Sequence, residues 1–435
     1  MIKRIRSPRI FFGWWINVVT GILTGLGSGF TSQGSSVFFK SIASDLSLSR
    51  AATSVASGIG AVQNNVMFAL TGWLSDRFGP KWPIIAGMCL TGIGLILMNF
   101  ITSPWDYYIV WGVIIVGGNT LGFTVAIDKM LTNWFIRKRG VVFGVRFALM
   151  GILGALLLPL LSWLSVVQGW RMSCLIWAGV VFASVPIALY FVRPKRPEYY
   201  GLLPDGAKVE SGSEAGKDTM IAKGVEYAAD FQETEFTLRQ AMRTPAYWLL
   251  AVAWIIRGLV SGGFQLHCIP FLTDMGIAPV VAGSMMAMMV FFTIPSAFLS
   301  GIIADRVRKD RLNFLPVGLF LLMAIGITAF LLNQTVATVY VFLILWGFGG
   351  GAFTPVTIVI ISRYFGRKAY GSIQGSIAIF SAPVSLLTPI YTGWVYDVTG
   401  SYITAFTLFA VVSACGAFLM CLIRPPKSPA YISKT

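Results

Sequence analysis

Charged side chains are scarce in this chain, and the groups that usually perform chemistry are scarcer still. Charged residues make up 11% of the 435 residues, and His267 is the single histidine. The five cysteines form no CxxC pair, so neither a metal centre nor a redox centre is indicated. No phosphate-binding Walker loop and no nucleophile beside a base is found. These absences argue against an enzyme, an ATP-driven pump and a bound cofactor.

Long apolar runs are what the chain has in abundance. Hydrophobic residues make up 56% of it, in runs of about 20 residues, the length that a helix needs to cross a hydrocarbon core of roughly 30 Å. The sequence therefore predicts an all-α membrane protein. Its twelve expected transmembrane helices cover residues 13–38, 54–75, 82–101, 106–133, 141–165, 172–192, 246–271, 282–303, 313–332, 337–361, 371–395 and 402–423.

The basic residues lie mainly in alternate loops between these runs. The net charge of +16 could suggest a nucleic-acid partner, but its distribution follows the positive-inside rule. This pattern predicts that both termini are cytoplasmic, in a multi-pass protein of the cell inner (cytoplasmic) membrane. Contact with the lipid bilayer explains the charge without nucleic acid. The clusters lie at residues 3–9, 77–81, 137–139, 306–311 and 363–368.

The chain repeats itself with an offset of about 230 residues. A glycine, an aspartate and an arginine at one spacing occur after the second run and again after the eighth, as Gly72, Asp76 and Arg77 and as Gly301, Asp305 and Arg306. Six spans separate the two copies, so the halves share one orientation. Parallel six-helix repeats are typical of one large transporter architecture, whose site lies at the interface of the repeats.

The repeat divides the chain into three parts. Residues 1–192 form an N-terminal six-helix bundle and residues 244–435 a C-terminal one. Residues 193–243 are polar and predict a flexible cytoplasmic linker. Near its end, Thr237 and Pro245 bracket a short predicted surface helix.

The loop after the second run carries the most specific motif. Gly72 would let neighbouring helices approach, and Asp76 could accept from the amides of a helix N-terminus or pair with a basic residue. Gly79 permits the turn into the next helix. We expect these residues to gate the cytoplasmic side with Arg77 and with the second copy, Asp305 and Arg306. The alternative is a charged loop that only fixes topology.

This motif resembles the loop signature of the major facilitator superfamily. Further stretches resemble prokaryotic members of its monocarboxylate-porter and oxalate/formate-antiporter group, namely VFFKSI at 37–42, NWFIRKRG at 133–140, RPEYYGLLPDG at 196–206 and HCIPFLTDMG at 267–276. The resemblance covers nearly the whole chain. It implies the two-bundle fold, with helices 1, 4, 7 and 10 around a central cavity.

Two positions depart from the pattern of that group. An Asp/Arg pair four residues apart in helix 8 is replaced by Thr293 and Ala297. The basic residue often found in helix 1 of animal relatives aligns with Gln33, which we keep as a candidate substrate contact.

Three basic side chains, Lys129, Arg146 and Arg257, fall inside apolar runs, opposed there by Asp128. A charge at the bilayer centre costs at least about 2.5–3.5 kcal/mol, so this surplus of positive charge predicts an anionic ligand. Arg257, near the middle of its run, is the expected anchor for a carboxylate, because its planar fork binds one bidentately.

Asp128 and Arg146 lie at matching depths of a helical hairpin and predict an ion pair. That pair could brace the hairpin, or Asp128 could carry a proton. Lys129 and Arg257 would then remain as a net charge of +2, unless Lys129 extends to the membrane interface. Asn119 and Arg146 are further candidate contacts for the substrate. His267 could bind, gate or carry a proton, and a simple hydrogen-bonding role at the helix end is the alternative.

These features predict a secondary active transporter of a small organic anion, a carboxylate. It would work by alternating access as a monomer, with proton symport or anion exchange as the coupling. An efflux transporter of drugs or other amphiphilic compounds is the alternative, although embedded acids expected for cationic drugs are few. A receptor or sensor without transport activity is a further alternative, and it would need an attached cytoplasmic signalling domain.

Overall fold

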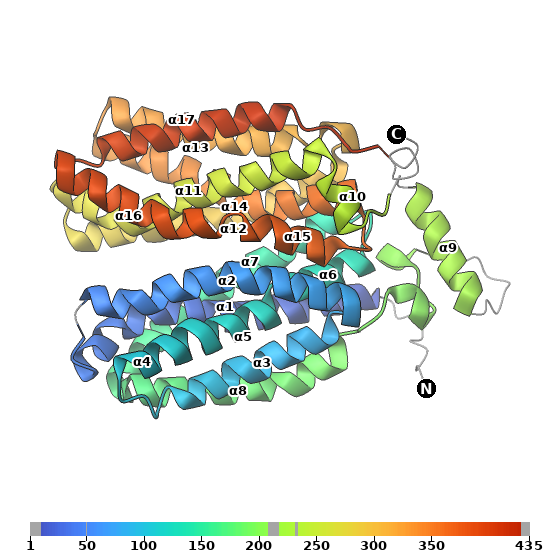
Figure 1. The fold of residues 1–435 in the computed structure, drawn as a ribbon, viewed down its shortest axis with the longest axis horizontal. Helices are drawn as coiled ribbons and strands as arrows, with labels where there is room; N and C mark the ends of the chain where they lie inside the picture. The colour runs from blue at the N-terminus through green and yellow to red at the C-terminus, as the bar shows by residue number, and fades with distance from the viewer. Residues whose placement is uncertain (1–9, 49, 208–216, 231–233, 428–435) are drawn as a thin grey trace.

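The computed structural model describes residues 10–48, 50–207, 217–230 and 234–427, with only the backbone described at some helical positions. All regular structure in these ranges is helical. Figure 1 shows two helical bundles that lie one above the other with their helices along the long axis of the molecule. The all-α fold and its division into two bundles are as the sequence predicts.

The first bundle runs from α1 to α8. Within it α1 packs on α7, and α3 packs on both α5 and α8. Its fourth segment is not one continuous α-helix, because it contains a π-helical stretch and a break at Thr124 (φ −120°, ψ −108°). Its elements are α1 (Phe12–Asp45), α2 (Arg50–Phe78), α3 (Lys81–Leu97), α4 (Pro104–Tyr107), η1 (Tyr108–Ile115), α5 (Val116–Phe123), α6 (Val125–Trp134), α7 (Arg139–Val167) and α8 (Gly169–Phe191).

The second bundle runs from α11 to α17. Here α12 and α13 pack on α14, α13 also packs on α17, and α11 packs on α16. The bundles meet where α2 packs on α15 and α7 on α12. The elements are α11 (Pro245–Asp274), α12 (Pro279–Arg306), η4 (Lys309–Arg311), α13 (Phe314–Leu332), α14 (Val336–Phe365), α15 (Tyr370–Ile379), α16 (Ala382–Thr399) and α17 (Ile403–Cys421).

Nine helical stretches of the described residues are long and apolar enough to cross a membrane. The remaining three predicted spans fall on α1, α2 and α3. With 17 residues, α3 is about 25 Å long, which is short for a bilayer core. The total of twelve spans stays a prediction.

The described parts of the linker contact both bundles, and the flexibility expected of the linker stays a prediction. Asp205 accepts hydrogen bonds from the backbone amides of Ile136, Arg137 and Lys138 at 3.0, 2.8 and 3.0 Å. Polar composition suggested flexibility, but here the polar groups find partners at the ends of the helices. The linker elements are η2 (Pro197–Tyr200), η3 (Pro204–Gly206), α9 (Lys217–Asp230) and α10 (Leu238–Met242).

One linker prediction is confirmed. The short helix before Pro245 is α10, and the side chain of Thr237 caps it by accepting from the amide of Gln240 at 3.3 Å. Figure 1 shows α9 and α10 together at one end of the molecule, which we call the linker end.

Candidate functional site

A cavity of about 290 Å³ lies between the two bundles and contains Arg257. The first bundle contributes α2 to its wall, and the second contributes α11, α14 and α16. None of the described lining residues is acidic. The lining consists of Ala61, Asn64, Asn65, Trp254, Arg257, Gly258, Ser261, Thr354, Ser381 and Ser385.

Arg257 lies 12 residues after the start of α11, about 18 Å along the helix, which is near the middle of a bilayer. Its guanidinium lies over the ring of Phe353 at 5.9 Å, and its Nη2 is 3.5 Å from the carbonyl oxygen of Gly350. Among the described residues, no carboxylate lies within ion-pair distance of it. The cation therefore keeps most of its hydrogen-bonding capacity for a ligand.

Two further donors flank Arg257 on the same face of α11, one turn before and one turn after it. The indole Nε1 of Trp254 and the hydroxyl of Ser261 are buried, and neither has a hydrogen-bond partner within the described part of the chain. Sequence analysis missed both, although their spacings of three and four residues from Arg257 are those of one helix face. An unpaired buried donor costs about 1–3 kcal/mol, so these donors also favour a polar ligand.

The first bundle adds two amides to the cavity, Asn64 and Asn65 of α2. The Asn65 Oδ1 accepts from the hydroxyl of Ser381 at 3.1 Å, a contact that joins the bundles. The Asn64 Oδ1 lies 2.6 Å from the hydroxyl of Thr120. The two adjacent asparagines within the apolar run at 54–75 are the sequence feature from which this side of the cavity could have been predicted.

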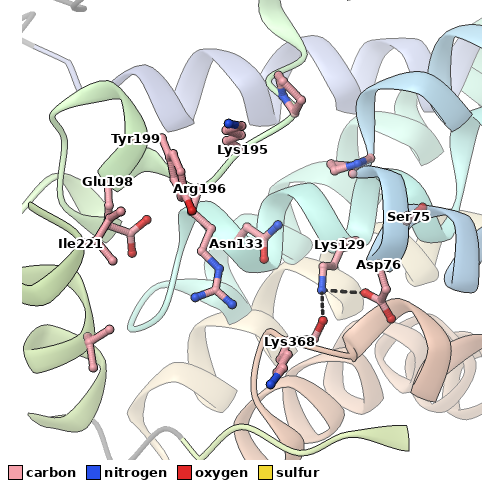
Figure 2. A pocket seen from close by; sticks show the side chains of 14 residues that line it. Ser75, Asp76, Lys129, Asn133, Lys195, Arg196, Glu198, Tyr199, Ile221 and Lys368 are labelled. Atoms are coloured by element: carbon pink, nitrogen blue, oxygen red, sulfur yellow. Dashed lines mark hydrogen bonds and ion pairs between the residues drawn. The ribbon is translucent and has the colours of Figure 1, made fainter. Parts of the chain in front are cut away.

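Lys129 is not a free cation in the structure, which corrects the predicted net charge of +2. Its Nζ lies 2.6 Å from Oδ1 of Asp76 and donates to the carbonyl oxygen of Lys368 at 2.8 Å (Figure 2). It also donates to the carbonyl oxygen of Arg367. Asp76 was assigned to a loop gate, and the fold brings that gate against α6. Lys129 and Arg257 were predicted to stay unpaired. Within the described residues, Arg257 still has no carboxylate partner, whereas Lys129 is paired with Asp76.

Lys129 and Asp76 line a second cavity of about 380 Å³ at the linker end. Arg196, Glu198 and Lys368 also line it, and Figure 2 shows linker side chains facing those of the first bundle. This cavity lies between the linker and the helix ends and is separate from the one that holds Arg257.

Asp128 and Arg146 form the predicted ion pair, and both are buried. The second oxygen of Asp128 accepts from Nε2 of Gln374 in the other bundle at 3.0 Å. Arg146 also donates from Nη2 to the carbonyl oxygen of Phe123 at 2.9 Å. That carbonyl precedes the break at Thr124, so Arg146 satisfies backbone that the interrupted helix leaves open inside the membrane.

The predicted gate motif of the first half joins the two bundles, and we call this contact the first clamp. Asp76 of α2 accepts from the amides of Gly371 and Ser372, at 3.2 and 2.6 Å, at the start of α15. A Cβ on Gly72 would lie 2.0 Å from the carbonyl oxygen of Gly371, so only glycine allows this approach. A carboxylate at a helix N-terminus is favoured by the free amides and the helix dipole.

The second copy of the motif forms a matching contact, the second clamp. Asp305 of α12 accepts from the amides of Gly140 and Val141, at 2.6 and 2.8 Å, at the start of α7. A Cβ on Gly301 would lie 2.1 Å from the carbonyl oxygen of Gly140. Arg363 is the neighbouring cation, 3.8 Å from Asp305.

Other residues of the gate motif have different surroundings. Gly79 has φ +83°, as a turn that favours glycine requires. Arg77 is exposed and stacks over Trp73 and Phe78, at 5.2 and 5.4 Å from the ring centroids. Arg306 is exposed and lines a cavity beside Asp305.

His267 and Asn119 do not line the Arg257 cavity. His267 bridges helices, with Nε2 3.0 Å from the carbonyl oxygen of Pro389 and Nδ1 3.3 Å from the hydroxyl of Tyr402. Because a carbonyl only accepts, Nε2 carries the proton, and this fits the simple hydrogen-bonding alternative. Asn119 is buried in α5. The side chain of Gln33 lies outside the described residues.

Two helical bundles with membrane-spanning segments and a polar cavity between them define the class of multi-pass membrane transport proteins. The chain belongs to the Major Facilitator Superfamily, whose family profile matches residues 21–388 and 317–435. In the described residues no group of three or more potential metal-ligating side chains occurs.

Curated relatives carry transporter names. The chain is 23% identical to monocarboxylate transporter 13 of Rattus norvegicus, over 97% of the chain and 89% of the relative. It is 27% identical to monocarboxylate transporter 1 of Rattus norvegicus, over 94% and 83%. It is also 21% identical to the transporter YycB of Bacillus subtilis, over 89% and 88%. These relatives and the family indicate a transport role without enzymatic activity.

Solved structures confirm the fold. A human organic anion transporter matches 95% of this chain and 100% of its own with a TM-score of 0.68 and 12% identity. A proton:xylose symporter matches 94% and 95%, with a TM-score of 0.69 and 13% identity. At such identities the likeness concerns the architecture of the bundles.

Proposed function

We propose that this protein is a secondary active transporter of a small organic anion, and that its substrate carries one carboxylate. The observation that carries this proposal is the cavity between the bundles, whose described lining contains no acidic residue and in which Arg257 faces no carboxylate of the described residues. A guanidinium binds a carboxylate through two parallel hydrogen bonds. The names of the monocarboxylate transporter relatives support the same class of substrate.

The size and charge of the cavity favour a small monovalent ligand. Its volume of about 290 Å³ is at the lower end of typical ligand pockets. One carboxylate neutralises Arg257, whereas a second would meet no further cation in the described lining. Trp254 and Ser261 supply donors for the remaining carboxylate oxygen positions or for a hydroxyl group of the substrate. A bulky amphiphile, as in the efflux alternative, gains little from such a polar lining.

Transport would proceed by alternating access of the two bundles. Both clamps lie at the linker end, which the positive-inside pattern assigns to the cytoplasm of the inner membrane. In our proposal the clamps hold that end closed and release when the cavity opens towards it, with no second subunit required. Coupling would come from a proton on Asp128 or from exchange with a second anion.

Uptake by proteoliposomes containing the purified protein tests the proposal. A short-chain monocarboxylate should be taken up and should raise the thermal stability in detergent, since ligand stabilisation follows RT ln(1 + [L]/Kd). Its uncharged amide analogue should do neither. Arg257→Gln should abolish both effects, and Arg257→Lys should restore them poorly because the bidentate fork is lost.

A matched control is Arg171→Gln, because Arg171 is only partly buried, in its pair with Asp45, and does not line the Arg257 cavity. This variant should transport like the unmodified protein. Normal uptake and normal ligand stabilisation in Arg257→Gln would refute the assigned anchor. An inward-directed proton gradient then distinguishes proton symport from anion exchange. It stimulates net uptake by a proton symporter and leaves the rate of one-for-one anion exchange unchanged.

A further inference from the structure

The two bundles end in similar sequences with different surroundings. An arginine followed by a proline comes two or three residues after the last helix of each bundle, as Arg193 and Pro194 after α8 and as Arg424 and Pro425 after α17. The two arginines occupy matching positions of the repeat. The residues around each arginine therefore show how each bundle accommodates the same cation.

In the first bundle the linker covers this position. The guanidinium of Arg193 lies over the rings of Phe12, Tyr190 and Tyr200, with its Cζ 5.2, 6.0 and 5.7 Å from their centroids. Tyr200 belongs to η2 of the linker. The cation thus lies against three aromatic side chains of the chain itself, and cation–π attraction accounts for its placement.

In the second bundle the matching arginine lines an open cavity of about 400 Å³. Three cations surround it, Arg243 before α11 and Arg424 and Lys427 after α17. Among the described residues that line it none is acidic, and the rest of the wall is largely apolar, including Ala246, Leu249 and Leu422.

The position of this cavity relates it to the membrane surface. It lies at the start of the candidate span Pro245–Phe264 and at the end of the candidate span Ile403–Cys421. Figure 1 shows that α10 and the end of α17 are at the linker end. Leu422, at its edge, is 53% exposed. An exposed leucine beside three cations at the end of two spans is suited to the boundary between headgroups and acyl chains.

We propose that this cavity binds the headgroup of an anionic phospholipid from the leaflet at the linker end. The phosphate would lie between Arg243, Arg424 and Lys427, and the acyl chains would run along Leu249 and Leu422 into the bilayer. Basic side chains at the membrane surface attract anionic lipids, and an apolar wall suits the chains of a lipid better than a free phosphate. The bound lipid replaces the cover that the linker gives to Arg193.

Native mass spectrometry of the purified full-length protein with added phosphatidylglycerol tests this site. The unmodified protein should bind phosphatidylglycerol more tightly than phosphatidylcholine. Each of Arg243→Gln, Arg424→Gln and Lys427→Gln should weaken binding about five-fold, and the triple variant about 100-fold. Arg424→Lys should keep most of the affinity, because the charge remains.

Two variants serve as controls. Arg311→Gln removes an exposed cation of η4, and Arg193→Gln removes the matching arginine that the linker covers. Both should bind phosphatidylglycerol like the unmodified protein. Equal binding by the triple variant, or an equal loss in Arg311→Gln, would overturn the site. Displacement of the lipid by glycerol phosphate at the same concentration would also overturn it, because a free phosphate would then be the ligand.

Discussion

The first and second clamps share their backbone geometry and differ in how their charge is neutralised. In both, a glycine of one helix touches the carbonyl oxygen of a glycine in the other bundle, and an aspartate accepts from two amides at a helix start. Asp76 of the first clamp is 2.6 Å from Lys129, whereas Asp305 of the second is 3.8 Å from Arg363.

The cations of the two clamps come from positions that the repeat does not match. Lys129 corresponds to Val359 in the second half, and Arg363 corresponds to Asn133 in the first. Arg363 donates mainly to the carbonyl oxygens of Val307 and Asp305, at 2.9 and 3.2 Å. The comparison teaches that the repeat preserves the glycine contact and the capped helix, while each half neutralises its carboxylate separately.

The largest effect on stability should come from the ion pair of Asp128 and Arg146, which adjoins the first clamp. Asp128, which contacts Gln374 of α15, and Arg146 are both buried, so removing one partner leaves a charge unpaired. Asp128→Asn or Arg146→Gln should each destabilise the protein by about 3–5 kcal/mol. Thermal unfolding in detergent measures the loss.

The double variant Asp128→Asn with Arg146→Gln should recover much of that stability, because no orphan charge remains. Additive losses would mean that the two side chains do not act as a pair. A double variant that folds and exchanges anions, but no longer accumulates them in a pH gradient, would identify Asp128 as the proton carrier.

Neutralising the two clamp aspartates should give unequal effects. Asp76→Asn weakens two amide contacts and leaves Lys129 without its carboxylate, which we expect to cost about 1.5–3 kcal/mol. Asp305→Asn, with its more distant cation, should cost about 1 kcal/mol. Asp76→Asn should slow transport and leave equilibrium ligand affinity nearly unchanged. Equal losses of stability would show that Lys129 does not distinguish the clamps.

The glycine contacts should respond alike in both clamps. Gly72→Ala and Gly301→Ala each place a Cβ about 2 Å from a backbone carbonyl oxygen, and such overpacking costs about 1–3 kcal/mol. The helices must separate, so a cysteine engineered at the linker end should become more reactive towards a maleimide. Gly154→Ala in α7 is the control, because no atom of the described residues outside its own turn of helix lies within 4 Å of its added Cβ. A response confined to one clamp would contradict their structural equivalence.

The smallest effect should come from the linker pair beside the first clamp. Arg196 and Glu235 lie 2.8 Å apart with side chains 29% and 38% exposed, so solvent screens their attraction. A double-mutant cycle of Arg196→Ala and Glu235→Ala should give a coupling of about 0.2–1 kcal/mol. A coupling above that range would make the pair part of the first clamp.

Much of the site could be predicted where the evidence was local or repeated. The gate motif at Gly72 and Asp76 was found through its second copy, and the Asp128–Arg146 pair through the matching depths of two neighbouring spans. Lys129 was assigned as free because Asp76 was treated as a loop residue. Trp254 and Ser261 were detectable from their spacing around Arg257 but were overlooked.

The sequence by itself determined the helices, the repeat and the depth of Arg257, because apolar length and helical spacing are properties of consecutive residues. Tertiary structure decided which charges meet. Lys129 is neutralised by an aspartate of another helix, and Asn65 and Arg257 come to one cavity from different bundles. The described part of the linker, too, meets the first bundle through contacts such as that of Asp205 with the amides after α6. Such contacts depend on how helices that are distant in the sequence pack together, and local sequence patterns do not predict that packing.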